Sequence, residues 1–152
     1  MISRHSLRGA AAAAAFAASI FVAAGGAFAD TDRDDPSATA EAFLTAYKAR
    51  DLVAMAPLMN EVNQEMFQEL AAAGENHPRY KSIFSGWRAE AVDGWTGTLG
   101  TVRYNNGQAL VPFAEANDET IIVVLDKEDA GWAVEDVNSP STGRFNRLPT
   151  SP

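Results

Sequence analysis

The sequence predicts an α+β domain in which N-terminal helices pack on a curved antiparallel sheet of about four strands. Between residues 36 and 90 the apolar residues recur every three or four positions, which is typical of amphipathic helices. From residue 98 to residue 137 the pattern changes to alternation, and short polar turns separate the segments. Because turns this short cannot connect parallel strands, we expect an antiparallel meander with the helices on one face. A strongly curved sheet would give a cone-like fold with a hollow beneath the helices.

The composition limits the classes of protein and of chemistry. The chain has 152 residues, 12 basic against 20 acidic, a formal charge of −8 and no cysteine. This length suits a single domain, and the negative charge disfavours nucleic acid and anionic membrane surfaces as partners. The lack of cysteine excludes disulfides, thiol nucleophiles, iron–sulfur clusters and cysteine-based zinc sites.

Residues 1–29 have the three regions of a secretory signal peptide. Arg4 and Arg8 give a positive start, an uncharged alanine-rich stretch follows, and Ala27-Phe28-Ala29 places small residues where a signal peptidase cleaves. The alternative is an uncleaved membrane anchor. We expect cleavage before Asp30, a periplasmic or secreted protein, and no membrane contact thereafter. The removed segment holds two arginines and no acidic residue, so the formal charge becomes −10.

Four helices are expected in the first half of the domain. Asp35 and Pro36 suit a helix start, and the first apolar stripe contains Ala40, Phe43, Leu44 and Tyr47. Asp51 can cap a second, short helix that Pro57 interrupts. The third helix extends from Val62 to Ala73, and the fourth from Tyr80 to about Glu90.

Four strands are expected after them, at residues 98–104, 109–113, 120–125 and 132–137. Asn106-Gly107 predicts a tight turn after the first strand. Pro112 cannot donate to a strand neighbour, so it indicates an edge or a β-bulge. These elements predict a flexible acidic start at residues 30–35, one domain at residues 36–141, and an irregular tail at residues 142–152.

Two segments resemble a known superfamily. Residues 42–59 (AFLTAYKARDLVAMAPLM) and residues 121–141 (IIVVLDKEDAGWAVEDVNSPS) are similar to the opening helices and the last hairpin of nuclear transport factor 2-like (SnoaL/ketosteroid-isomerase-like) proteins. That superfamily contains steroid isomerases, dehydratases and polyketide cyclases, as well as non-catalytic binding modules and dimerisation domains. The resemblance implies the cone-like fold, but a fold alone does not imply an activity.

No residue pattern predicts a catalytic centre, a metal site or a cofactor. The resemblance places the isomerase oxyanion donor at or near Phe43, and a phenyl ring cannot donate a hydrogen bond. His77 lies in a predicted exposed turn. The acidic segment Asp30-x-Asp32-x-Asp34 has calcium-loop spacing but Asp35 where the loop needs glycine.

The sequence instead favours a ligand pocket at the junction of the helices and the sheet. An apolar pocket with a few polar groups is the usual form of a ligand site, and the residues that we expect to form it are Trp87, Arg88, Glu90, Trp95 and Tyr104. The alternative for the two junction tryptophans is structural packing, and Trp132 is expected in the core.

The leading functional hypothesis is an exported, non-enzymatic binding module for a small apolar molecule. The resemblance also implies a homodimer or a protein partner on the outer sheet face, with Val111 or Phe113 and Ile122 or Val124 facing it. The alternative hypothesis is a small cofactor-free enzyme of the cyclase or dehydratase type. Its buried carboxylate would act beside Tyr104, and the candidates are Glu90, Asp93 and Asp136.

Overall fold

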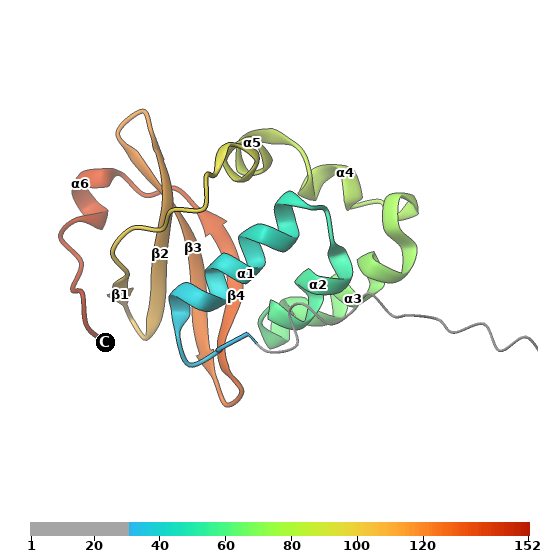
Figure 1. The fold of residues 1–152 in the computed structure, drawn as a ribbon, viewed down its shortest axis with the longest axis horizontal. Coiled ribbons are helices and arrows are strands. Elements are labelled where there is room, and N and C mark those ends of the chain that lie inside the picture. The colour runs from blue at the N-terminus through green and yellow to red at the C-terminus, as the bar shows by residue number, and fades with distance from the viewer. Residues whose placement is uncertain (1–30) are drawn as a thin grey trace, which may run out of the picture.

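A computed structural model describes residues 31–152, and it has the predicted α+β architecture (Figure 1). Helices from the first half of the chain lie over one face of an open, four-stranded antiparallel sheet. The predicted signal peptide, its cleavage site and Asp30 lie outside the described residues. Within residues 31–152, no helix has the length and apolar character that crossing a membrane requires.

The helices begin at the capping residues that the sequence indicates. The side chain of Asp35 accepts a hydrogen bond from the backbone of Ser37 (2.8 Å), and that of Asp51 accepts one from Ala54 (3.0 Å). The α-helices are α1 (Pro36–Lys48), α2 (Leu52–Met55), α3 (Glu61–Ala73), α4 (Tyr80–Ile83) and α5 (Gly86–Gly94), with 3₁₀ turns at Ala56–Leu58 and Gly74–Asn76.

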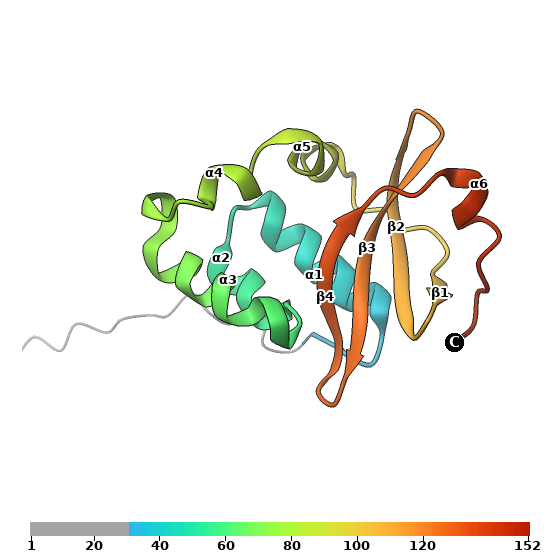
Figure 2. The same ribbon diagram turned by 180° about the vertical axis from the view of Figure 1, so that it is seen from behind.

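The predicted fourth helix is in fact two helices, α4 and α5. The chain leaves the helical conformation after Ile83, and Gly86 has a φ of +77°. A left-handed φ is easy for glycine and costly for other residues, so Gly86 permits the change of direction. The α4–α5 segment therefore bends over the end of α3 and α1 and does not continue as one straight helix (Figure 2).

The four strands form a meander in the order β1 (Arg103–Asn105), β2 (Gln108–Ala116), β3 (Glu119–Glu128) and β4 (Gly131–Asn138). Asn106 and Gly107 form the predicted turn between β1 and β2, with φ values of 50° and 81°. The first strand is shorter than predicted, because residues 98–102 are not paired as a strand.

Two β-bulges bend the sheet. The β2–β3 register shifts between Pro112 and Ala114, which confirms the irregularity predicted at Pro112. In the β3–β4 pair, Leu125 faces Val134 and Val124 faces Asp136, so Glu135 is an extra residue. The bulge at Glu135 allows Val134 and Val137 to point to the same, helix-covered side of β4.

The main core lies between the sheet and the helices. Its fully buried side chains include Leu44, Met55, Leu70, Val92, Val111, Val123 and Val134. Trp132 is also buried in this core, as the sequence predicts. Apolar burial of this kind is the main favourable term in folding, and here it fixes the helices over one face of the sheet.

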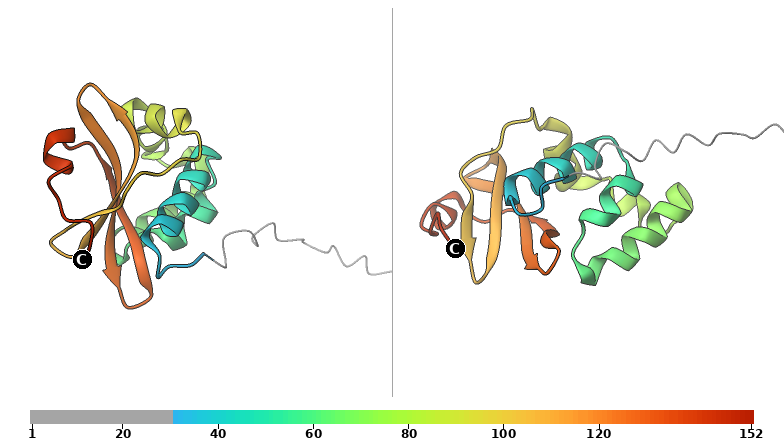
Figure 3. Two further views of the ribbon diagram at one scale, coloured as in Figure 1. Left: turned by 60° about the vertical axis from the view of Figure 1, so that its left-hand side comes forward. Right: turned by 60° about the horizontal axis from the view of Figure 1, so that its bottom comes forward.

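The outer face of the sheet has a cover within the same chain. Ile122 and Val124 lie on this face with Leu110, and they are buried beneath Phe145 with Leu148 packed beside them. Phe145 belongs to α6 (Thr142–Phe145), a one-turn helix inside the segment for which the sequence predicted only an irregular tail. Figure 3 shows α6 on the side of the sheet opposite the helices.

The cover changes the sequence-based argument for a second subunit. Val111 and Phe113 belong to the helix-facing core, so they do not face a partner. Ile122 and Val124 do lie on the outer face, but the tail already buries them. Phe145 and Leu148 therefore cover the outer-face residues that were expected to face a second subunit.

Candidate functional site

A cavity of about 230 Å³ lies between the helices and the last strand. Its walls come from α1, α3, α4, α5 and β4, and most of them are apolar. The apolar lining residues are Phe43, Tyr47, Met59, Met66, Phe67, Ile83, Val134 and Val137, and the polar ones are Asn63, Ser82, Arg88, Glu135 and Asp136.

Helix periodicity and the β4 bulge together produce these walls. Phe43 and Tyr47 are one turn apart on α1, so both side chains lie on the same helix face. Met66 and Phe67 line the cavity from α3, and Val134 and Val137 line it from β4. The cavity thus depends on segments that are distant in sequence and that only the tertiary fold brings together.

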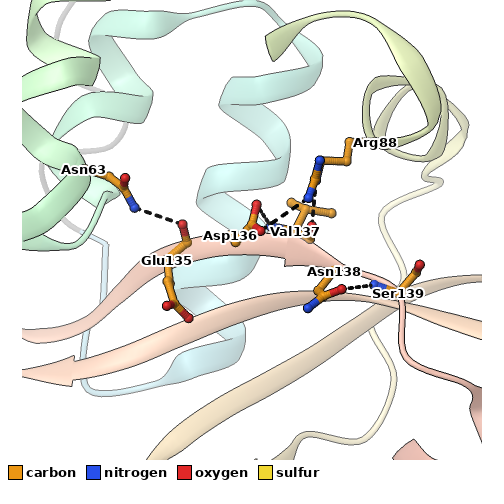
Figure 4. Close-up of polar contacts among 7 residues, drawn as sticks. All are labelled: Asn63, Arg88, Glu135, Asp136, Val137, Asn138 and Ser139. Atoms are coloured by element: carbon orange, nitrogen blue, oxygen red, sulfur yellow. Dashed lines mark hydrogen bonds and ion pairs between the residues drawn. The ribbon is translucent and has the colours of Figure 1, made fainter. Parts of the chain in front are cut away.

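The polar side of the cavity is formed by Arg88 on α5 and by β4 (Figure 4). The Nε of Arg88 donates a hydrogen bond to the carbonyl of Val137 at 2.8 Å. One Nη forms an ion pair with Asp136 at 3.3 Å, and the two side chains are 45% and 53% exposed. The guanidinium also lies 4.7 Å from the ring centre of Trp87. Arg88 is thus held at the rim by three separate contacts.

Asn63 closes another part of the rim. Its side-chain amide donates to the carbonyl of Glu135 at 3.0 Å and to the side chain of Asn60 at 2.9 Å. The backbone N–H of Asn60 donates to the carbonyl of Val134 at 2.8 Å. Together with Arg88, these residues bind carbonyl groups along the exposed edge of β4, which limits pairing of that edge with another strand.

Tyr47 connects α1 to the roof of the cavity. Its buried hydroxyl donates a hydrogen bond to the carbonyl of Ile83 in α4, and its ring packs edge-on against Phe43 and Phe84. Burial raises the pKa of Tyr47 above its ordinary value, although the charges of Arg50 and Arg88 partly oppose this effect. The hydroxyl is therefore neutral at physiological pH and acts as a hydrogen-bond donor.

The roof itself is lightly packed. Residues 74–86 contain no buried side chain, yet Ser82 and Ile83 line the cavity. Gly74 and Gly86, at the two ends of this segment, have φ values of +56° and +77°. Three side chains of this segment, Tyr80, Ile83 and Phe84, are partly buried against the core. Segments without fully buried side chains open locally at a lower free-energy cost than the core does.

The structure brings together only some of the residues that the sequence predicted for the site. Arg88 lines the cavity, and Trp87 stacks beside it with 44% of its surface exposed. Trp95 is 7% exposed, and its indole N–H donates to the carbonyl of Thr98 at 2.8 Å. Glu90 is exposed on α5, and Tyr104 lies on β1 near Trp132. Neither Glu90, Trp95 nor Tyr104 lines the cavity.

The carboxylates considered for catalysis are all accessible to solvent. Asp93 forms an ion pair with Arg50 at 2.9 Å, Asp136 pairs with Arg88, and Glu90 is exposed. Among residues 31–152, no acidic side chain is buried, and the buried residues of polar type are Thr39, Asn60 and Thr120. The described part of the chain has no group of three or more metal-binding side chains.

Sequence reasoning missed most of the cavity walls. Tyr47 was recognised only as part of an apolar helical stripe, and Met66 was included only as part of the predicted third helix. Asn63 gave a weak signal, since it is a polar side chain three residues after the capping residue Asn60.

Comparisons of the chain with protein-family models, curated proteins and solved structures find no match.

Proposed function

We propose that the protein is an exported, non-enzymatic binding module that holds a small amphipathic molecule in this cavity. The observation that carries the proposal is a hollow with apolar walls and a polar rim on one side. Pockets for drug-sized ligands usually have volumes of about 300–1,000 Å³. A cavity of about 230 Å³ is suited to a smaller molecule.

Binding agrees with the geometry better than the alternative, a cyclase or dehydratase. Such an enzyme needs a carboxylate whose pKa is shifted by an apolar setting. Asp136 is the acid nearest to this requirement, but it is half exposed and paired with Arg88. The hydroxyl of Tyr47 already donates to the carbonyl of Ile83. A proton donor and a base aimed at one point in the cavity are thus not among the described lining residues.

Export and membership of the nuclear transport factor 2-like superfamily are part of the same proposal. Residues 1–29 support export through their signal-peptide pattern. The order of elements supports membership, since α1, the Asp51-capped α2 and α3 precede a meander that ends in the strand beginning at Gly131-Trp132. A homodimer through the outer sheet face is not proposed, because Phe145 and Leu148 cover the apolar side chains of Leu110, Ile122 and Val124 on that face.

Native mass spectrometry of the protein purified from its own envelope fraction tests the proposal. We expect a retained small molecule in the wild-type protein and its loss in Met66→Trp, because the larger side chain fills the cavity. Val62→Trp is the matched control, since Val62 is on the same helix but is exposed and does not line the cavity. Retention of the same mass by Met66→Trp would contradict the proposal.

A further inference from the structure

We infer that the ligand carries an anionic group, such as a carboxylate, that binds Arg88 while its apolar part occupies the cavity. The inference rests on the proposed function, and it adds the chemical class of the ligand. Among the described residues that line the cavity, Arg88 is the one basic side chain. A guanidinium has planar N–H donors that match the two oxygens of a carboxylate.

Arg88 has two contacts besides its acidic partner. Its Nε is bound by the carbonyl of Val137 (2.8 Å), and its guanidinium lies over the ring of Trp87 (4.7 Å). Both partners are uncharged parts of the protein, so they do not compete with an anion for the positive charge. Because these contacts fix the side chain in advance, little rotamer entropy is lost when a ligand binds.

The pair between Arg88 and Asp136 can be exchanged at little cost. Its N–O distance is 3.3 Å, and about half of each side chain is exposed. Solvent screens such a pair, and exposed ion pairs contribute little to stability. A ligand carboxylate at the mouth of an apolar cavity is shielded on one side by the walls, so it gains a stronger interaction with Arg88 than Asp136 has.

A cationic ligand fits the same rim less well, because the acidic groups are already engaged. One oxygen of Asp136 accepts from the backbone N–H of Val137 (2.8 Å), and the other pairs with Arg88. Glu135 accepts a hydrogen bond from Gln108 at 2.6 Å. The net charge of −8 repels anions at long range, but salt limits this effect to about 8 Å at physiological ionic strength. Glu135 and Asp136 lie within that range and repel an anion, so the ligand anion must displace Asp136 from Arg88 in order to bind.

Calorimetric titration with three probes of the same skeleton tests the inference: phenylacetate, 2-phenylethanol and 2-phenylethylamine. We expect phenylacetate to bind about tenfold to a hundredfold more tightly than the alcohol, which is the usual effect of a hydrogen bond to a charged group. Arg88→Gln should remove this preference while the alcohol still binds. Asp136→Asn should strengthen phenylacetate binding about two- to fivefold, because it removes the competing charge.

Each outcome separates this inference from the proposed function. Equal or tighter binding of the alcohol or the amine would overturn the anionic class and leave a binding cavity. Weaker or unchanged phenylacetate binding in Asp136→Asn would also overturn it, and this variant retains Arg88 with its contacts to Trp87 and Val137. If the wild-type protein binds none of the three probes and retains no molecule from the envelope, the proposed function itself fails.

Discussion

Replacement of Phe145 by alanine tests whether the C-terminal segment is an integral cover of the sheet. Phe145 is 4% exposed and packs on Leu110, Ile122 and Val124. Truncation of a buried phenylalanine to alanine usually costs about 3–5 kcal/mol. Because α6 is a single turn near the end of the chain and can move toward the space left behind, we expect a value near the lower limit, about 3 kcal/mol.

Urea unfolding followed by tryptophan fluorescence gives the free energy of unfolding of this variant. Leu148→Ala is the matched control, since Leu148 is only partly buried on the same face and should cost less. Sedimentation should show self-association of Phe145→Ala but not of the wild-type protein, because the truncation uncovers the outer face. A loss below about 1 kcal/mol without a change in oligomeric state would refute the packing argument.

Three further predictions concern the contact between Gly131 and Arg33, the hydrogen bond of Tyr47 and export. Gly131→Ala should cost about 3 kcal/mol in urea unfolding and Gly107→Ala about 1 kcal/mol. Both glycines have positive φ, but a Cβ at Gly131 would lie 2.5 Å from the Arg33 carbonyl, whereas a Cβ at Gly107 would meet no atom within 4 Å. Equal losses of unfolding free energy in the two variants would therefore contradict the close contact at Gly131. Because burial raises the pKa of Tyr47, the stability that its hydroxyl contributes should be constant below pH 10 and fall as the pH rises through the raised pKa. The free energies of unfolding of wild type and Tyr47→Phe should therefore converge as the pH rises across this range. A difference between them that stays constant with pH would contradict the burial of the hydroxyl. Mass spectrometry of the exported protein should give a chain that begins at Asp30, whereas an intact first segment would favour the membrane anchor.

The parts of the fold that sequence could predict are those set by local chemistry. Asp35 and Asp51 cap helices because their side chains reach backbone N–H groups two or three residues ahead. Asn106 and Gly107 form a turn because they accept positive φ. The break at Gly86 was missed because a glycine inside an apolar helical pattern is also tolerated within a helix.

The parts that could not be predicted depend on contacts between distant segments. Phe145 and Leu148 are two apolar residues in an otherwise polar, proline-containing tail, which is too few for a periodic pattern that would indicate burial. The two junction tryptophans have similar sequence surroundings, yet Trp95 is buried while Trp87 remains half exposed beside Arg88. The cavity combines residues from four helices and one strand, and for this reason sequence identified Arg88 but not Tyr47.

Methionine methyl NMR with added phenylacetate tests the binding cavity most directly. Residues 31–152 contain three methionines, of which Met59 and Met66 line the cavity, while Met55 is buried elsewhere in the core. We expect the methyl resonances of Met59 and Met66 to shift together and saturate, while that of Met55 stays in place. Unchanged resonances of Met59 and Met66, or an equal shift of Met55, would contradict a ligand site between the helices and β4.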